Sequence, residues 1–472
     1  MTNFLAQCRD AIGAQHVLTE DADIVGYVRD WRGRFSGKAL AVVKPGNTEE
    51  VATVVRICRN FRIPIVPQGG NTGLVLGSVP DESGTAIVLS LTRLAAIRTI
   101  DLLNNTITVE AGCILSHIQQ AAFQANRLFP LSLASEDSCT IGGNLSTNAG
   151  GTAVLRYGNA RELCLGLEVV TAEGEIWNGL RALRKDNTGY DLRDLFIGAE
   201  GTLGIITAAV LKLFPQPAAQ VTAFAAMQTH HDALEFLKLM QSQCGTLLTG
   251  FEFMSDDCLQ LVTHHFPSSR SPFSRPYPHY VLIDISDNES TDHANSLLEK
   301  AFSKAMQQNI IQDAVIAQSH AQSQGLWFLR EQISAAQAIE GKNIKHDIAV
   351  PISAIGDFVR ITASLLQASF PHSRLIVFGH LGDGNLHFNV SPPKNISDEE
   401  FIAHQLEINR IVHDSVHNFG GTISAEHGLG ALKNHEIIRY KSAVEIKMMQ
   451  MVKHSFDPFD LMNPGKGISL QH

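Results

Sequence analysis

A short segment in the second half of the chain constrains the fold more than any other. Two apolar runs, 376–378 and 386–390, flank the pair Asp383-Gly384. An Asp-Gly pair between such runs is the strongest short-range signal for a β-hairpin. If the pair forms a two-residue type I′ turn, His380 and His387 lie directly opposite each other. The sequence therefore predicts a hairpin that presents two imidazoles on one face.

Two imidazoles placed in this way can share a metal ion. Zinc binds imidazole nitrogen at about 2.0–2.1 Å, and catalytic zinc usually has three protein ligands and one open position. A carboxylate is the expected third ligand, and Glu426 is the candidate. The adjacent His427 would serve in proton transfer. A histidine pair across a hairpin is more often a surface feature, so the metal hypothesis also needs support from the flanking sequence.

The overall composition excludes several classes of protein. A length of 472 residues suggests two or three domains. The net charge of −10 and the lack of a basic stripe argue against a nucleic-acid partner. The seven cysteines are odd in number and form no Cys-x-x-Cys, which favours free thiols, and we expect a cytoplasmic protein. No secretory signal and no apolar run long enough to span a membrane is found.

Periodicity predicts mixed helices and strands. Strands are expected at Ala39–Val43 and Ile63–Val66, with a helix between them that Asn47 or Thr48 could cap, which makes a β-α-β unit. Further on, a hairpin is expected over Leu167–Trp177 and a domain boundary at Pro215 and Pro217. Helices are expected at Leu326–Ala338, Ile402–Val416 and Val444–Phe456.

Two glycine-rich loops favour a large dinucleotide ligand. The first, residues 68–74, follows a predicted strand, and the second spans residues 139–151. Backbone amides exposed in such loops can hold a pyrophosphate. Neither loop has the G-x-G-x-x-G spacing that opens a helix, and neither is a Walker loop. Either loop alone could equally well be a tight turn without a ligand. The presence of two such loops favours a dinucleotide site.

Longer motifs carry a resemblance to a known family. Residues 67–74, 139–144 and 195–207 resemble the FAD domain of the vanillyl-alcohol-oxidase superfamily. Residues 380–387 and 424–428 resemble its D-2-hydroxyacid dehydrogenase branch. Residues 183–192 are most similar to the D-2-hydroxyglutarate dehydrogenases of that branch. The resemblance covers the chain from Val43 to Ile468.

The resemblance implies an α+β architecture. A vanillyl-alcohol-oxidase-type (PCMH-type) FAD-binding domain is expected over residues 1–215, rejoined by 446–472. A sheet-and-helix substrate (cap) domain with the metal site is expected over 216–445. Some relatives attach the flavin through a histidine at the place of Asn71, so we expect non-covalent FAD here. The implied FAD-binding residues are Gln68, Gly69, Gly70, Asn71, Thr72, Gly73, Leu74, Ser138, Thr140, Gly142, Gly143, Asn148, Gly150, Ile206 and Asn463.

The resemblance also implies catalytic roles. It assigns metal ligation to His380, His387 and Glu426 and the general base to His427, which would also contact the substrate. The substrate would be a D-2-hydroxy acid, oxidised to the 2-oxo acid by hydride transfer to flavin. Zinc fits mixed nitrogen and oxygen ligands, and manganese or cobalt could substitute.

A carboxylate substrate needs cations. The resemblance matches Arg330, Ser334 and Lys345 to a substrate-carboxylate clamp, although the family commonly has Thr at the place of Ser334. Arg330 and Ser334 lie at i and i+4 of one predicted helix and would share a face. Asn389 lies two residues after His387, so it belongs to the same strand face and is a further substrate contact.

Several functions stay open on the sequence alone. D-2-hydroxyglutarate is the leading substrate and D-lactate the alternative. The same superfamily contains ether-lipid synthases that use flavin without net oxidation. A non-catalytic flavin-binding subunit is a third reading, but the intact histidine and glutamate set argues against it. We expect an electron-transfer flavoprotein, a quinone or a cytochrome as acceptor, rather than NAD or oxygen, and base rates favour a homodimer.

Overall fold

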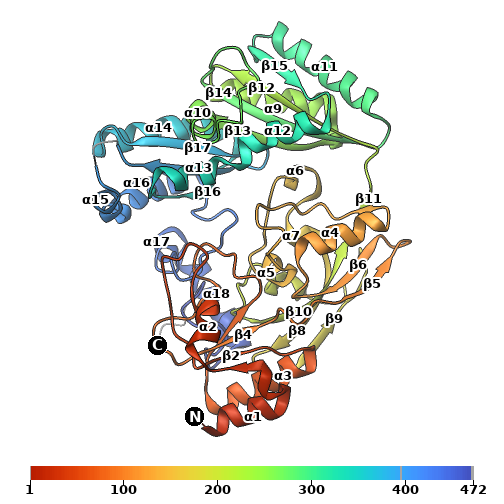
Figure 1. Ribbon diagram of the computed structural model, residues 1–472, viewed down its shortest axis with the longest axis vertical. Helices are drawn as coiled ribbons and strands as arrows, with labels where there is room; N and C mark the ends of the chain where they lie inside the picture. The colour runs from red at the N-terminus through yellow and green to blue at the C-terminus, as the bar shows by residue number, and fades with distance from the viewer. Residues whose placement is uncertain (1, 394–395, 469–472) are drawn as a thin grey trace. The chain divides into compact units, whose positions relative to one another are not determined.

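The computed structural model describes residues 2–393 and 396–468, and the chain forms two compact units. The first unit comprises the residues up to Gly150, Gly158–Pro215, and the residues from Glu426 onward (Figure 1). The second unit comprises Gly151–Tyr157 and Gln216–Ala425. The chain thus re-enters the first unit at Glu426, whereas the sequence analysis expects this return at residue 446.

The first unit begins with a small sheet of mixed strands. Its four strands are, in spatial order, β1 (Val17–Leu18), β2 (Ala41–Val43), β4 (Ile87–Ser90) and β3 (Ile65–Gln68). Strands β2 and β3 both run parallel to β4, which lies between them. The predicted β-α-β unit is therefore confirmed, with α3 (Thr48–Phe61) as its helix. The side chain of Asn47 accepts a hydrogen bond from the Glu50 amide, so Asn47 caps the helix.

The second sheet of this unit is fully antiparallel. It has five strands in the order β5 (Ile97–Asp101), β6 (Thr106–Glu110), β10 (Gly204–Lys212), β8 (Cys164–Thr171) and β9 (Ile176–Gly179). The predicted hairpin over 167–177 is confirmed as β8 and β9. A two-stranded sheet pairs β11 (Phe214–Pro215) with β7 (Arg127–Leu128). The remaining helical segments are α1 (Thr2–Ile12), η1 (Ala14–His16), α2 (Asp21–Val28), α4 (Leu115–Gln124), α5 (Ile141–Ser146), α7 (Ala160–Leu163), α8 (Arg193–Phe196), α17 (Ile437–Tyr440) and α18 (Ala443–Phe456).

The second unit is built on a seven-stranded antiparallel sheet. Its order is β15 (Asp313–Ile316), β12 (Ala219–Met227), β14 (His279–Asp287), β13 (Leu248–Ser255), β17 (Arg374–His380), β18 (Asn385–Ser391) and β16 (Asp347–Ala349). One face packs on α10 (Asp256–His265), α12 (His320–Glu331) and α13 (Ile333–Glu340), which form one apolar core with it. On the other face, Phe236 and Phe358 of the helices α9 (His230–Cys244) and α14 (Ile355–Ser369) contact β13 and β18. The unit is completed by α6 (Val154–Tyr157), η2 (Gly245–Leu247), α11 (Thr291–Gln307), η3 (Ile352–Ala354), α15 (Asp398–Ala403) and α16 (Gln405–Asn418).

The predicted hairpin over 376–390 is present, but its predicted register is wrong. Strand β17 ends at His380 and β18 begins at Asn385, so residues 381–384 connect them. Phe378, not His380, lies opposite His387. The turn is longer than two residues because the Asp383 side chain accepts a hydrogen bond from the Asn385 amide, an Asx turn within the loop. The shift is an even number of residues, so both histidines stay on one face as diagonal neighbours.

Two predicted helices are interrupted. The helix expected over 326–338 is split, because α12 ends at Glu331 and α13 begins at Ile333. Arg330 and Ser334 therefore lie on two helices and not on the one that was predicted, and Arg330 is buried whereas Ser334 is exposed. The helix expected over 402–416 is likewise divided into α15 and α16, and the helix expected over 444–456 is confirmed as α18. Within the described part of the chain, no helix has the length and apolarity that crossing a bilayer requires.

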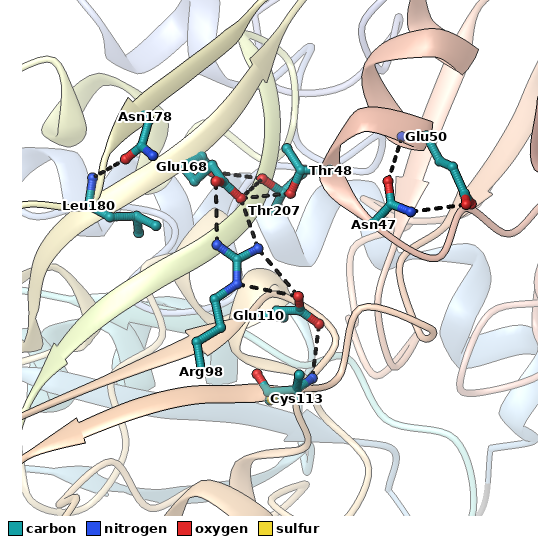
Figure 2. Close-up of polar contacts among 11 residues, drawn as sticks. Asn47, Thr48, Glu50, Arg98, Glu110, Cys113, Glu168, Asn178, Leu180 and Thr207 are labelled. Atoms are coloured by element: carbon teal, nitrogen blue, oxygen red, sulfur yellow. Dashed lines mark hydrogen bonds and ion pairs between the residues drawn. The ribbon is translucent and has the colours of Figure 1, made fainter.

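A buried polar cluster fixes α3 against the antiparallel sheet of the first unit. The carboxylate of Glu168, on β8, accepts hydrogen bonds from Thr48 at 2.6 Å, Thr207 at 3.0 Å and Arg98 at 3.1 Å (Figure 2). Arg98 also pairs with Glu110 on β6 at 3.3 Å. Burial alone would raise the pKa of Glu168, but the bonds from Arg98, Thr48 and Thr207 outweigh it and lower the pKa. One carboxylate therefore joins a helix and three strands.

We expect Arg98→Met to destabilise the first unit by about 3 kcal/mol, because it leaves Glu168 buried without its cation. A suitable control is Arg59→Met, whose partner Glu173 is exposed, so its loss should stay below about 1 kcal/mol. Denaturant-induced unfolding of the two variants measures the difference. Equal midpoints for both variants would show that the cluster does not stabilise the fold.

Candidate active site

The glycine-rich segments surround one cavity in the first unit. Predicted residues that line it are Gln68, Gly69, Gly70, Asn71, Thr72, Gly73, Thr140, Gly142, Gly143 and Ile206. The predicted base, His427, also lines this cavity. Lining residues that the sequence analysis did not name include Gly77, Ser78, Asn144, Ser146, Thr147, Glu200 and Gly201. Glu200 and Gly201 lie inside the motif 195–207, so the resemblance to the FAD domain could have predicted them as cavity residues.

Close backbone packing explains two of the glycines. A Cβ atom on Gly70 would lie 2.0 Å from the carbonyl oxygen of Ser138, and one on Gly69 would lie 2.1 Å from Oγ1 of Thr140. Neither distance is possible, so the two loops can meet only where side chains are absent. Ser138 itself does not appear among the lining residues and contributes its carbonyl behind Gly70.

The cavity also contains polar atoms that a ligand can satisfy. The buried Thr140 Oγ1 and Asn144 Oδ1 have no hydrogen-bond partner among the described residues. Buried polar atoms are normally hydrogen-bonded, so these two need a group from outside the protein. Together with the glycine-rich walls, they fit a large polar ligand such as a dinucleotide.

Five of the predicted flavin-binding residues lie outside the lining of the cavity, namely Leu74, Ser138, Asn148, Gly150 and Asn463. One of these, Asn463, supports the wall from behind, whereas Asn148 bonds to a residue outside the lining. Asn463 donates hydrogen bonds to the carbonyl oxygens of Gly77 and Glu200 at 2.8 and 2.7 Å. The side chain of Asn148 accepts a bond from the Arg161 amide at 3.0 Å.

Gly150 lies against the side chain of Glu426. A Cβ atom at this position would lie 2.4 Å from Oε1 of Glu426. The missing side chain therefore makes room for the Glu426 carboxylate within the first unit.

Glu200 holds the segment that carries His427. Its carboxylate accepts hydrogen bonds from the amides of Leu429 and Gly430, both at 2.8 Å. Burial raises the pKa of Glu200, and the two amide bonds oppose that rise. Gly428 has φ +79°, and a Cβ atom there would lie 2.8 Å from Cδ of Glu200. The chain after His427 is thus tied to the wall of the cavity.

The second unit presents the other predicted residues on one face of its sheet. The rings of His380, on β17, and His387, on β18, have centroids 5.8 Å apart. Asp347 lies opposite His387 on β16, with 3.9 Å between its Oδ1 and the His387 Nδ1. Asn385 donates a hydrogen bond to Asp347 at 2.9 Å and fixes that carboxylate.

Glu252, which the sequence analysis missed, lies opposite His380 on β13. Its Oε1 is 2.6 Å from Nδ1 of His380, and its Oε2 is 2.8 Å from Nη2 and 3.0 Å from Nε of Arg330. Burial alone would raise the pKa of Glu252, but the adjacent His380 and Arg330 outweigh it and lower the pKa. Glu252 is the single glutamate of the buried strand Leu248–Ser255. Because charged residues are almost never fully buried unless paired, this pattern could have predicted that Glu252 has a partner.

The predicted substrate contacts differ in how firmly the fold holds them. The guanidinium of Arg330 lies 4.8 Å from the centre of the Phe378 ring and is 8% exposed. The Asn389 amide donates to Gln337 at 2.8 Å and accepts from the His346 amide. The bridge from Ile344 to Val390 places Lys345 opposite Asn389, on the face that carries His387.

Glu426 and His427 open the last segment of the first unit. The preceding residue, Ala425, ends the second unit, and its amide donates a hydrogen bond to the Asp347 carbonyl at 3.3 Å. Glu426 therefore follows, after one peptide bond, a residue attached to the strand beside His387.

Solved structures share this fold. A p-cresol methylhydroxylase matches with a TM-score of 0.81 at 16% identity, over 100% of this chain and 97% of its own. The 4-ethylphenol oxidase from Gulosibacter chungangensis matches with a TM-score of 0.76 at 18% identity, over 99% and 97%. The predicted α+β architecture with a PCMH-type FAD-binding domain is confirmed.

Sequence relatives are much closer. The domain family described as FAD linked oxidases, C-terminal domain, matches residues 216–467, and that described as FAD binding domain matches residues 39–179. The D-2-hydroxyglutarate dehydrogenase of Xanthomonas citri pv. viticola is 38% identical over 97% of this chain and 95% of its own length. The mitochondrial D-2-hydroxyglutarate dehydrogenase of Danio rerio is 36% identical over 93% and 80%. The chain therefore belongs to the FAD-linked oxidases, in the family of the D-2-hydroxyglutarate dehydrogenases, and is an FAD-linked oxidoreductase.

Proposed function

We propose that the enzyme oxidises D-2-hydroxyglutarate to the 2-oxo acid, with D-lactate as the alternative substrate. The observation that carries this proposal is the buried guanidinium of Arg330 held through Glu252 to His380. A carboxylate-binding cation and an imidazole that can bind a metal thus meet at one point of the sheet. The names of the relatives support the choice of substrate.

We propose His380, His387 and Glu426 as ligands of one divalent metal. The bond from His380 Nδ1 to Glu252 would leave Nε2 of that ring as the nitrogen that holds the metal. Two imidazoles and a carboxylate suit zinc, and manganese or cobalt are the substitutes. When bound, the metal supplies a Lewis acid that acidifies the substrate hydroxyl, and FAD supplies the hydride acceptor.

The substrate carboxylate is proposed to bind Arg330 and Lys345. Because Nε and one N–H of Nη2 pair with Glu252, Arg330 would meet the substrate end-on, through Nη1 and the second N–H of Nη2. Lys345, which precedes β16 and lies opposite Asn389, is proposed as a second cation. Ser334 and the second N–H of the Asn389 amide are further proposed hydrogen-bond donors.

His427 is the proposed general base, supported by its position on the wall of the flavin cavity and directly after Glu426. It would take the hydroxyl proton while the hydride leaves Cα. An imidazole suits this task because its pKa lies close to neutral pH.

We propose that the flavin is held without a covalent bond. Asn71 carries no nucleophile, and its amide already donates to the Arg29 carbonyl at 2.8 Å and accepts from Ser78 at 2.9 Å. The proposed flavin contacts are the cavity-lining residues given above, with Asn463 and Ser138 behind them.

The proposed electron acceptor is an electron-transfer flavoprotein, a quinone or a cytochrome, and a homodimer is the proposed assembly. The cytoplasm is the proposed location, which the seven buried free thiols support. Burial raises the pKa of Cys8 and Cys113 to about 11, so they stay protonated and unreactive at neutral pH.

The substrate can be tested directly on the flavin. Mixed anaerobically with the enzyme, D-2-hydroxyglutarate should bleach the flavin fastest, D-lactate more slowly and L-2-hydroxyglutarate not at all. Stopped-flow absorbance measures the rates. Bleaching by a glyceryl-phosphate ester and not by any hydroxy acid would contradict the proposal and favour an ether-lipid synthase.

The proposed base predicts a second result. His427→Asn should retain FAD but slow flavin reduction by D-2-hydroxyglutarate about 10²–10⁴-fold, the usual contribution of one positioned base. Its pH profile should lose one ionisation. The exposed His435 lies on the same segment, so His435→Asn should reduce its flavin at the parent rate. If His427→Asn also does so, the base is another residue.

A further inference from the structure

We infer that Glu252 is a positioning residue that sets two groups of the site at once, the metal-facing nitrogen of His380 and the substrate-facing edge of Arg330. The inference rests on the proposed function and deepens it. Its basis is the division of the carboxylate, with Oε1 at 2.6 Å from His380 and Oε2 at 2.8 Å from Arg330.

The contact to His380 determines how that ring can bind a metal. An ionised carboxylate only accepts hydrogen bonds, so Nδ1 of His380 carries the proton and donates it to Glu252. The ring is then held in one orientation, with the lone pair on Nε2. Carboxylate partners of this kind typically change metal affinity by about 10–100-fold when they are removed.

The contact to Arg330 determines which donors remain for a substrate. Glu252 occupies the Nε edge of the guanidinium, and the Phe378 ring lies 4.8 Å from its central carbon. The bonds at the Nε edge and the ring close to the central carbon together restrict how the guanidinium can turn. The Nη1–Nη2 end is therefore oriented before any carboxylate arrives.

The burial of Glu252 argues against a purely structural role. Glu252 is 1% exposed, and its strand neighbours Phe251 and Phe253 are buried as well. Removing a charge of this kind from water is unfavourable, and an apolar group of similar volume often stabilises a fold equally well. A carboxylate at this place therefore serves the two groups that it touches.

The neighbouring strand offers a matched control. Asp284, on β14, lies on the same face and is a carboxylate in the same sheet. It accepts hydrogen bonds from Thr222 at 2.6 Å and from Trp327 at 3.2 Å. Neither of these bonds involves His380 or Arg330, so Asp284→Asn changes a buried carboxyl group and leaves the hydrogen bonds of His380 and Arg330 in place.

Cobalt(II) binding to the full-length, FAD-loaded and metal-stripped enzyme tests the inference, with the visible cobalt spectrum as a readout independent of turnover. We expect Glu252→Gln to weaken Co²⁺ binding about 10–100-fold, to alter the spectrum and to raise KM for D-2-hydroxyglutarate. Glu252→Asp keeps the charge but is one methylene shorter, so it should lose less affinity. Asp284→Asn should bind Co²⁺ within about twofold of the parent.

The outcomes separate this inference from the proposed function. A parent enzyme that binds Co²⁺, with Glu252→Gln and Glu252→Asp both matching its affinity and spectrum, would overturn the role of Glu252 alone. A parent enzyme that binds no Co²⁺ but is bleached by D-2-hydroxyglutarate would overturn the metal site and this inference, but not the oxidation. If Glu252→Gln does not fold, Glu252→Asp decides between the two results.

Discussion

The sheet of the second unit carries charged side chains on a face that is otherwise a hydrophobic core. Glu252, His380 and Arg330 lie beside Met254, Phe378 and Leu329, and their burial is tolerated because each of the three polar groups has a partner. The carboxylate of Glu252 provides that pairing for two partners from different elements. The orientation of the His380 ring and of the Arg330 guanidinium, and with them the proposed binding of substrate, rest on this one buried group.

In the first unit, glycines shape the site because they have no side chain. Gly69 and Gly70 let one loop approach Thr140 and Ser138, and Gly150 leaves room for Glu426. The same segment then continues to His427, which Glu200 holds at the cavity through the following amides. The Ala425 amide, which precedes Glu426 in the chain, donates a hydrogen bond to Asp347 on the strand beside His387.

Local sequence patterns correctly predicted most of the helices and strands that were expected. They did not predict the contacts between residues that lie far apart in the sequence. Asp383-Gly384 correctly indicated a hairpin, but the Asx turn at Asp383 lengthened the loop, which propensity alone does not reveal. The histidines still share a face because side chains alternate with a period of two. The helix break at Gln332 lies between Arg330 and Ser334, and no proline or glycine at this place predicts it. Glu252 lies far from His380 in sequence, so only the strand order brings them together.

The proposed function depends above all on one divalent metal that His380, His387 and Glu426 are proposed to hold. Metal analysis of the purified protein and of His387→Ala, each with its FAD content, tests this most directly. We expect about one metal ion per chain in the parent, and loss of that metal with FAD retained in the variant, because removal of a ligand costs several kcal/mol of metal affinity. Stoichiometric metal and full activity in His387→Ala would contradict it.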